Sequence, residues 1–215
     1  MTTRERFTVF ALQMGIAVPF LYFATQIIAA PFFPNYSFLT MAASLLGSDL
    51  AIYPAIFNVG AIITGVATLL ASFGFLLALQ RLEVNHILAW LTSIAIFLNG
   101  IGSLWAGLIP LPDPRHGSNP FVVGIFALPV LLAITLWKQS NARTIKIYLI
   151  ITNLLFIAMI PIMSGITGID TQGYQGFLQR IVALIFFPPI GVGAYFLIKR
   201  VKPLKATNMT DKGSE

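Results

Sequence analysis

The residues that could do chemistry are few, and most of them lie in short stretches between long apolar segments. The candidates for a binding site are a guanidinium, three carboxylates, an imidazole and an amide, namely Arg180, Asp49, Asp113, Asp170, His116 and Asn58. A guanidinium pairs well with phosphate or carboxylate oxygens. The set could therefore bind an anionic or zwitterionic headgroup, or it could be a structural ion-pair network that closes one end of a helix bundle.

Arg180 is the unusual member because it lies inside an apolar segment, just after its start. A charged residue within a membrane span usually has a partner. We expect Arg180 to pair with Asp49, Asp113 or Asp170, with His116 nearby. The pairing is compatible with a structural network and with a binding or catalytic site.

Other kinds of chemistry find little support. The chain has no cysteine, which excludes disulfides, thiolate catalysis and cysteine-based metal sites. His86 and His116 are expected at opposite membrane faces, where they cannot share a metal, and we predict neither a metal nor a cofactor. A serine hydrolase built on Ser37 or Ser44 lacks the nucleophile-elbow pattern. Phosphate-loop, dinucleotide and HExxH motifs are absent from the sequence. Whether the protein is an enzyme stays open.

Small and polar residues also occur inside the apolar segments. Four of them follow one another at four-residue steps, which places them on one helix stripe: Gly60, Thr64, Thr68 and Ser72. Such a stripe is typical of a helix packing face, and a polar pathway is the alternative.

Three asparagines, Asn58, Asn99 and Asn153, lie within the spans. An unpaired amide in hydrocarbon is costly, so each should face the protein interior. They could join helices or contact a ligand, and Asn58 is the best placed for a ligand because it lies near the outer surface.

The elements that position these residues are membrane-spanning helices. The chain is 57% hydrophobic and 9% charged, whereas soluble domains carry roughly 25% charged residues. A spanning helix needs about 20 apolar residues. The charges divide the chain into six such segments: Thr8–Ala30, Pro54–Leu79, Ile87–Leu111, Phe121–Trp137, Ile147–Gly165 and Phe177–Ile198. We therefore predict an all-α, polytopic membrane helix bundle of about six transmembrane helices.

The basic residues predict the orientation. If the N-terminus is inside, the inner regions hold 11 of the 13 Lys and Arg residues, and the outer regions hold only Arg115 and Arg180. The positive-inside rule then places both termini in the cytoplasm. The prediction is one transmembrane domain over residues 1–205 of a cell-membrane protein, followed by a polar, disordered tail over 206–215. The basic charge lies in short segments between apolar runs, which is typical of membrane topology and not of nucleic-acid binding.

The longest connection is the first outer loop, Pro31–Tyr53. Its apolar stretch Ser37–Leu46 contains several small residues. It could lie on the outer surface as a short helix, or enter the membrane as a re-entrant turn.

Short motifs in this loop and beyond resemble a known family. They are Phe33–Ser37, Ser44–Gly47, Phe57–Gly60, Pro110–Pro114 followed by His116-Gly117, and Gly176–Ile181. In order and spacing, over about residues 10–198, the chain is similar to the domain-of-unknown-function 998 family of prokaryotic multi-pass membrane proteins. The resemblance implies a multi-pass fold without an assigned activity. That family's distant similarity to eukaryotic lipid-remodelling and autophagy-modulating membrane proteins suggests a lipid-related function by analogy alone. The resemblance also supports Asp49, Asp113, His116 and Arg180 as candidate site residues, because they lie in or beside the matching motifs.

Three functions remain open. The first is to bind, carry or modify a lipid or small amphiphile at the outer leaflet. The second is a small-solute transporter that uses Asn99 and Ser103, although no acid or base lies deep in any span. The third is a non-catalytic accessory membrane subunit. The sequence predicts membrane lipid as a partner and leaves the oligomeric state undefined.

Overall fold

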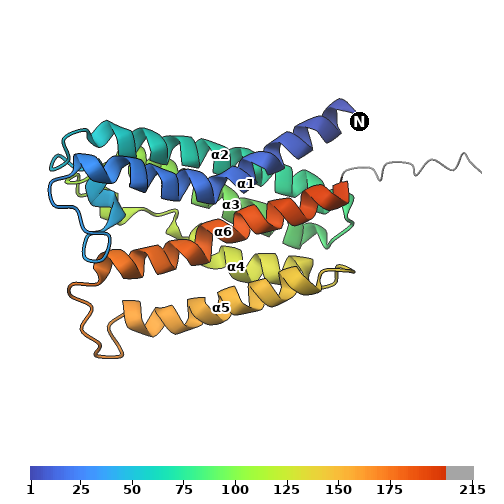
Figure 1. The fold of residues 1–215 in the computed structure, drawn as a ribbon. Coiled ribbons are helices and arrows are strands. Elements are labelled where there is room, and N and C mark those ends of the chain that lie inside the picture. Colours follow the sequence, from blue (N-terminus) through green and yellow to red (C-terminus); the bar gives the residue numbers. More distant parts are fainter. Residues whose placement is uncertain (202–215) are drawn as a thin grey trace, which may run out of the picture.

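The computed structural model describes residues 1–201, and for Val122 and Val123 only the backbone. This part of the chain is all-α, with six α-helices (Figure 1): α1 Thr3–Ala29, α2 Pro54–Arg81, α3 His86–Leu108, α4 Val122–Leu136, α5 Arg143–Met163 and α6 Gln175–Val201. Three short 3₁₀ helices lie in the connections: η1 Ala30–Phe32, η2 Ala43–Gly47 and η3 His116–Ser118. The predicted domain end at residue 205 and the tail over 206–215 lie outside the described residues.

Five of the helices, all except α4, are long and apolar enough to cross a membrane. This composition is typical of a multi-pass membrane protein. The remaining helix, α4, is as apolar as the others but has 15 residues. At 1.5 Å per residue it is about 22 Å long, which is shorter than the roughly 30 Å hydrocarbon core of a bilayer. All six predicted segments are helical, and the fourth is the one whose length does not by itself support a span.

Consecutive helices run in opposite directions, so their connections gather at two ends of the bundle (Figure 1). One end, here called the loop end, carries residues 30–53, 109–121 and 164–174. The other, here called the basic end, carries the start of α1, the end of α6 and the short turns 82–85 and 137–142. Eight described basic residues lie at the basic end: Arg4, Arg6, Arg81, Lys138, Arg143, Lys146, Lys199 and Arg200.

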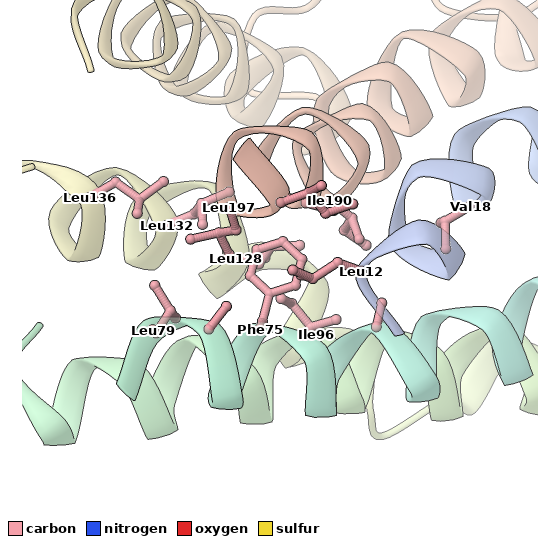
Figure 2. Packing of buried hydrophobic residues seen from close by; sticks show 14 of the residues in the cluster. Leu12, Val18, Phe75, Leu79, Ile96, Leu128, Leu132, Leu136, Ile190 and Leu197 are labelled. Carbon is pink, nitrogen blue, oxygen red and sulfur yellow. The ribbon is translucent and has the colours of Figure 1, made fainter. Parts of the chain in front are cut away.

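Helix α2 packs between α1 and α3, while α6 packs mainly on α1. Helix α4 joins α3 to α5, and α5 lies at the edge of the bundle, against α4 and α6 (Figure 1). The core centres on Phe75 of α2, a fully buried ring that meets side chains from four other helices (Figure 2). The surrounding side chains include Leu12, Ile96, Leu128, Leu132, Ile190 and Leu197. In lipid such a core is stabilised by close packing, because lipid tails are as apolar as leucine.

The stripe of small residues on α2 packs against the protein interior, as predicted. Thr64 and Thr68 are 1% and 0% exposed, and each hydroxyl donates a hydrogen bond to a carbonyl four residues earlier in α2. A Cβ added at Gly60 would overlap Thr25 of α1. The missing side chain of Gly60 therefore allows α1 and α2 to approach closely near the loop end.

Candidate functional site

Helix α4 begins well below the end of its neighbour α3. Asn119, three residues before α4, donates from Nδ2 to the carbonyl of Gly102 at 3.2 Å. Gly102 lies six residues before Leu108, the last residue of α3, which corresponds to a depth of about 9 Å. The connection 109–121, which includes the short helix η3, therefore runs back alongside α3 for about this distance before α4 starts.

A cavity of about 280 Å³ lies in this region, here called the loop-end cavity. Its walls come from α1, α2, α3, α6, the start of α4 and Asn119. The apolar lining residues are Tyr22, Phe57, Ala61, Gly102, Ala106, Ile125, Phe126, Val182, Ala183, Phe186 and Phe187. The polar ones are Thr25, Thr64, Ser103, Asn119 and Gln179. None of the lining residues carries a formal charge. An apolar, aromatic lining with a few uncharged polar groups is typical of small-molecule sites.

The aromatic walls of the cavity are held by ring contacts between helices. The Tyr22 ring of α1 stacks on Phe187 of α6 with centroids 4.1 Å apart. Phe186 of α6 meets Phe126 of α4 edge to face at 5.6 Å. Large rings in such contacts lose little mobility when a ligand binds, so the apolar surface is largely pre-formed.

The first loop is hydrogen-bonded across to the start of α6, beside the cavity. The Phe177 amide donates to the Leu39 carbonyl at 2.9 Å. The Ala43 amide donates to Oε1 of Gln179 at 2.6 Å. Gln179 therefore holds the loop and also lines the cavity. The apolar stretch that was expected to form a surface helix or a re-entrant turn is a series of turns ending in η2, fixed to α6 by these bonds.

Arg180 is the main polar link between this loop and α6. Its Nη1 donates to the carbonyls of Phe38, Met41 and Gly176 at 2.9, 3.1 and 2.7 Å. Its Nη2 donates to the Tyr36 hydroxyl at 2.6 Å, and its guanidinium carbon lies 4.8 Å from the Phe38 ring centroid. The guanidinium is thus surrounded by dipoles and a π-face. The carbonyl oxygens carry the partial negative charge that a carboxylate was expected to supply.

The predicted pairing of Arg180 with an aspartate is wrong, since no salt bridge joins them within residues 1–201. Asp113 instead pairs with Arg115 of its own loop at 2.6 Å, and the Arg115 hydrogen bonds lower the pKa of Asp113 to about 2. Asp170 accepts from the Gln172 amide at 2.9 Å, and Asp49 is exposed. The two bonded aspartates hold short turns of their own loops, and the predicted ion-pair network around Arg180 is not found within residues 1–201.

His116 and Asn58 also contact backbone groups nearby. The His116 Nδ1 lies 2.6 Å from the Ile109 carbonyl oxygen. Asn58 donates from Nδ2 to the Gly47 carbonyl at 3.0 Å, which joins the first loop to α2. A Cβ at Gly47 would fall 2.9 Å from the Phe57 ring and overlap Asn58 Oδ1. Ligand binding by the six predicted residues stays a prediction, and none of them lines the loop-end cavity.

The residues that sequence reasoning missed are Tyr36, Gln179 and Asn119. The first two lie within the quoted motifs, beside residues that were singled out, so the motif Gly176–Ile181 already contained the signal for Gln179. Asn119 has no such signal because its position depends on how far the chain descends before α4 begins. The expectation that Asn99 faces the interior is confirmed, as its side chain is 0% exposed.

Within the described part of the chain, no group of three or more His, Cys, Asp or Glu side chains is placed to hold a metal ion.

A family model described as "Protein of unknown function (DUF998)" matches residues 16–194. The curated proteins contain no match to this chain, and neither do the solved structures. The matched range includes every residue of the loop-end cavity.

Proposed function

This chain belongs to the DUF998 family, whose function is unknown, and we propose that it binds a lipid or small amphiphile in the loop-end cavity. The observation that carries the proposal is the lining itself, which combines aromatic and alanine walls with five uncharged polar side chains. Apolar walls suit a hydrocarbon chain. The hydroxyl and amide groups suit a carbonyl, ester or hydroxyl group at its polar end.

An uncharged lining favours an uncharged portion of the ligand inside the cavity. Burying an ion without an opposite charge is expensive, and Asp, Glu, Lys, Arg and His are absent from the lining residues. Arg180 lies close by, since Gln179 precedes it, but its Nη1 and Nη2 groups already donate to the loop and to Gly176. The role proposed for Arg180 is therefore to hold the loop beside the cavity.

The loop end is proposed to face the outer leaflet. The eight described basic residues at the opposite end support this orientation, because Lys and Arg accumulate on the cytoplasmic side of membrane proteins. Both termini would then be cytoplasmic, with six crossings of the membrane. The short α4 would complete its crossing with the end of the connection 109–121, where Asn119 is hydrogen-bonded to Gly102 of α3, because irregular backbone at membrane depth is tolerated where it packs on protein.

Binding is favoured over bond-breaking chemistry by the same lining. General acid–base catalysis needs a titratable group within hydrogen-bond reach of the substrate. Tyr22 is the titratable residue among those that line the cavity, and it is accompanied by neither a base nor an activated nucleophile there.

The proposal is tested by measuring the lipid that co-purifies with the protein. We expect mass spectrometry of an organic extract to find one amphiphile class near a 1:1 ratio. Ala106→Phe, which fills the cavity, should lower that ratio several-fold. Ile94→Phe is the matched control, because Ile94 lies on the same helix, is 45% exposed and does not line the cavity. Equal retention by both variants would contradict binding in this cavity.

A small-solute pathway is the second candidate, and Asn99 favours it. Both amide atoms of Asn99 are buried and lack a hydrogen-bond partner within residues 1–201. Asn99 lies one helical turn below Ser103, which lines the cavity. An unpaired buried amide costs about 1–3 kcal/mol, so a passing solute or water would supply a missing partner. Asn99→Cys in this cysteine-free chain separates the candidates. Labelling by a small polar thiol reagent supports a pathway, and complete protection supports a binding cavity that ends above Asn99.

A further inference from the structure

A second cavity, of about 700 Å³, lies at the basic end between α3, α4 and α5. It shares no lining residue with the loop-end cavity. Its mouth is formed by the turn that follows α2 and by the residues that follow α4. We call it the basic-end cavity, and its chemistry differs from that of the first because its lining is charged.

The mouth carries one acid and one base that are not paired with each other. Glu83 and Lys138 both line the cavity, and no salt bridge joins them within the described chain. Trp137 lines the same mouth and is 53% exposed, and the ammonium of Lys146 lies 5.9 Å from the Trp137 ring centroid. Trp and Lys together are typical of the level of a membrane where lipid headgroups lie.

Below its mouth the cavity is mainly apolar, and its polar residues there are Thr135 of α4 and, further along, Asn153 of α5. Its walls include Leu88, Val130 and Ile134, and its deep end includes Asn153. Asn153 lies ten residues after Arg143, the first residue of α5, which corresponds to a depth of about 15 Å. The cavity therefore extends from a charged mouth at the helix ends into an apolar interior.

The Asn153 amide is only half satisfied. Its Nδ2 donates to the carbonyls of Pro129 and Leu149 at 3.2 and 2.7 Å. Its Oδ1 is buried and has no partner among residues 1–201. A buried acceptor without a donor is unfavourable, and a hydroxyl group in this part of the cavity would supply the missing donor.

We propose that the basic-end cavity binds a phospholipid whose headgroup carries both a phosphate and a primary ammonium. Lys138 pairs with the phosphate, and Glu83 accepts hydrogen bonds from the ammonium. An acyl chain lies along the walls formed by α3, α4 and α5. The observation that selects this headgroup is the presence of an unpaired acid and an unpaired base in one mouth. A purely anionic lipid would leave Glu83 facing a negative charge. A trimethylated amine has no N–H group that could donate to Glu83. This site is independent of the function proposed for the loop-end cavity.

The test uses the full-length, delipidated protein in detergent and native mass spectrometry. Dioleoyl-phosphatidylethanolamine, dioleoyl-phosphatidylglycerol and dioleoyl-phosphatidylcholine are titrated separately. The ethanolamine lipid is expected to bind most tightly. Lys138→Gln should weaken both phosphatidylethanolamine and phosphatidylglycerol by about fivefold, which is the effect of one basic contact near a headgroup. Glu83→Gln should weaken phosphatidylethanolamine alone.

Two control variants make the result specific. Lys199→Gln removes a charge at the same end, from a lysine that lies over Tyr195 and does not line the cavity, and it should leave the three affinities unchanged. Lys138→Gln and Glu83→Gln are also compared in an Ala106→Phe background, which fills the loop-end cavity, and their effects on the three lipids should be the same there, so that each of the two proposals can fail without the other. Tightest binding of phosphatidylglycerol, equal binding of the three lipids, or a Glu83→Gln variant with an unchanged lipid preference would overturn the proposal.

Discussion

The Arg180 guanidinium and the Tyr36 hydroxyl are joined by a hydrogen bond of 2.6 Å, although 144 residues separate them in the chain. Tyr36 lies in the first loop and Arg180 in the second turn of α6. The Tyr36 hydroxyl in turn lies 3.3 and 3.2 Å from the carbonyls of Met41 and Ala42. The pair therefore fixes the fold of the loop itself as well as its position against α6, next to the loop-end cavity.

Removing the Arg180 side chain should destabilise the protein. Arg180→Ala deletes four donated hydrogen bonds, and loss of charge-assisted bonds of this kind is expected to lower the free energy of unfolding by about 2–4 kcal/mol. Arg180→Lys keeps the charge but supplies fewer donors in a different geometry, so it should be intermediate. The melting temperatures of both variants are measured by thermal unfolding in detergent. Arg115→Ala is the control because its ion pair is exposed, and an Arg180→Ala melting temperature equal to the Arg115→Ala value would refute this role.

Gly176 should tolerate no side chain, despite lying in a helix. Alanine normally stabilises a helix over glycine by about 1 kcal/mol. At Gly176, however, a Cβ would overlap the Met41 carbonyl and lie 2.7 Å from that of Phe38. Gly176→Ala is therefore expected to lower the melting temperature and to expose the loop to limited proteolysis. Gly117→Ala, whose Cβ would meet nothing within 4 Å, should have little effect. A stabilised Gly176→Ala variant would show that the loop does not pack on α6 in this way.

Gly60 gives a test of the contact between α1 and α2. Gly60→Leu should overpack the bundle against Thr25 and destabilise it by about 1–3 kcal/mol. Val59→Leu adds apolar bulk at the next position, which is 51% exposed, and should be neutral. The melting temperatures of the two variants are compared by thermal unfolding in the same detergent. Equal stability would place Gly60 on a lipid-facing surface.

The sequence predicted much of the fold because its signals are local. Six apolar segments and the small-residue stripe of α2 correspond to helices and to a buried packing face. The network around Arg180 was not predictable in detail, since its acceptors are mostly backbone carbonyls, which every residue has. The late start of α4, from which the loop-end cavity results, was also missed. That start depends on where Asn119 finds a partner on α3, which is a tertiary contact.

The proposed orientation predicts opposite labelling at two serines. Ser118 lies at the loop end and Ser140 at the basic end, and both are exposed. In intact cells, an impermeant thiol reagent should label Ser118→Cys and not Ser140→Cys, because the chain has no other cysteine. Permeabilised cells should show labelling of both, which controls for accessibility. The reverse pattern in intact cells would place the loop end, and its cavity, toward the cytoplasm.

The most direct test of the central claim is an experimental density map of the protein purified in mild detergent without added ligand. Binding in the loop-end cavity predicts elongated, non-protein density between α1, α2, α3 and α6, with its polar end within hydrogen-bond distance of Ser103, Asn119 or Gln179. The same map of Ala106→Phe should lack that density while the surrounding helices stay in place. A wild-type cavity occupied only by ordered water, or collapsed around its aromatic walls, would contradict the proposal.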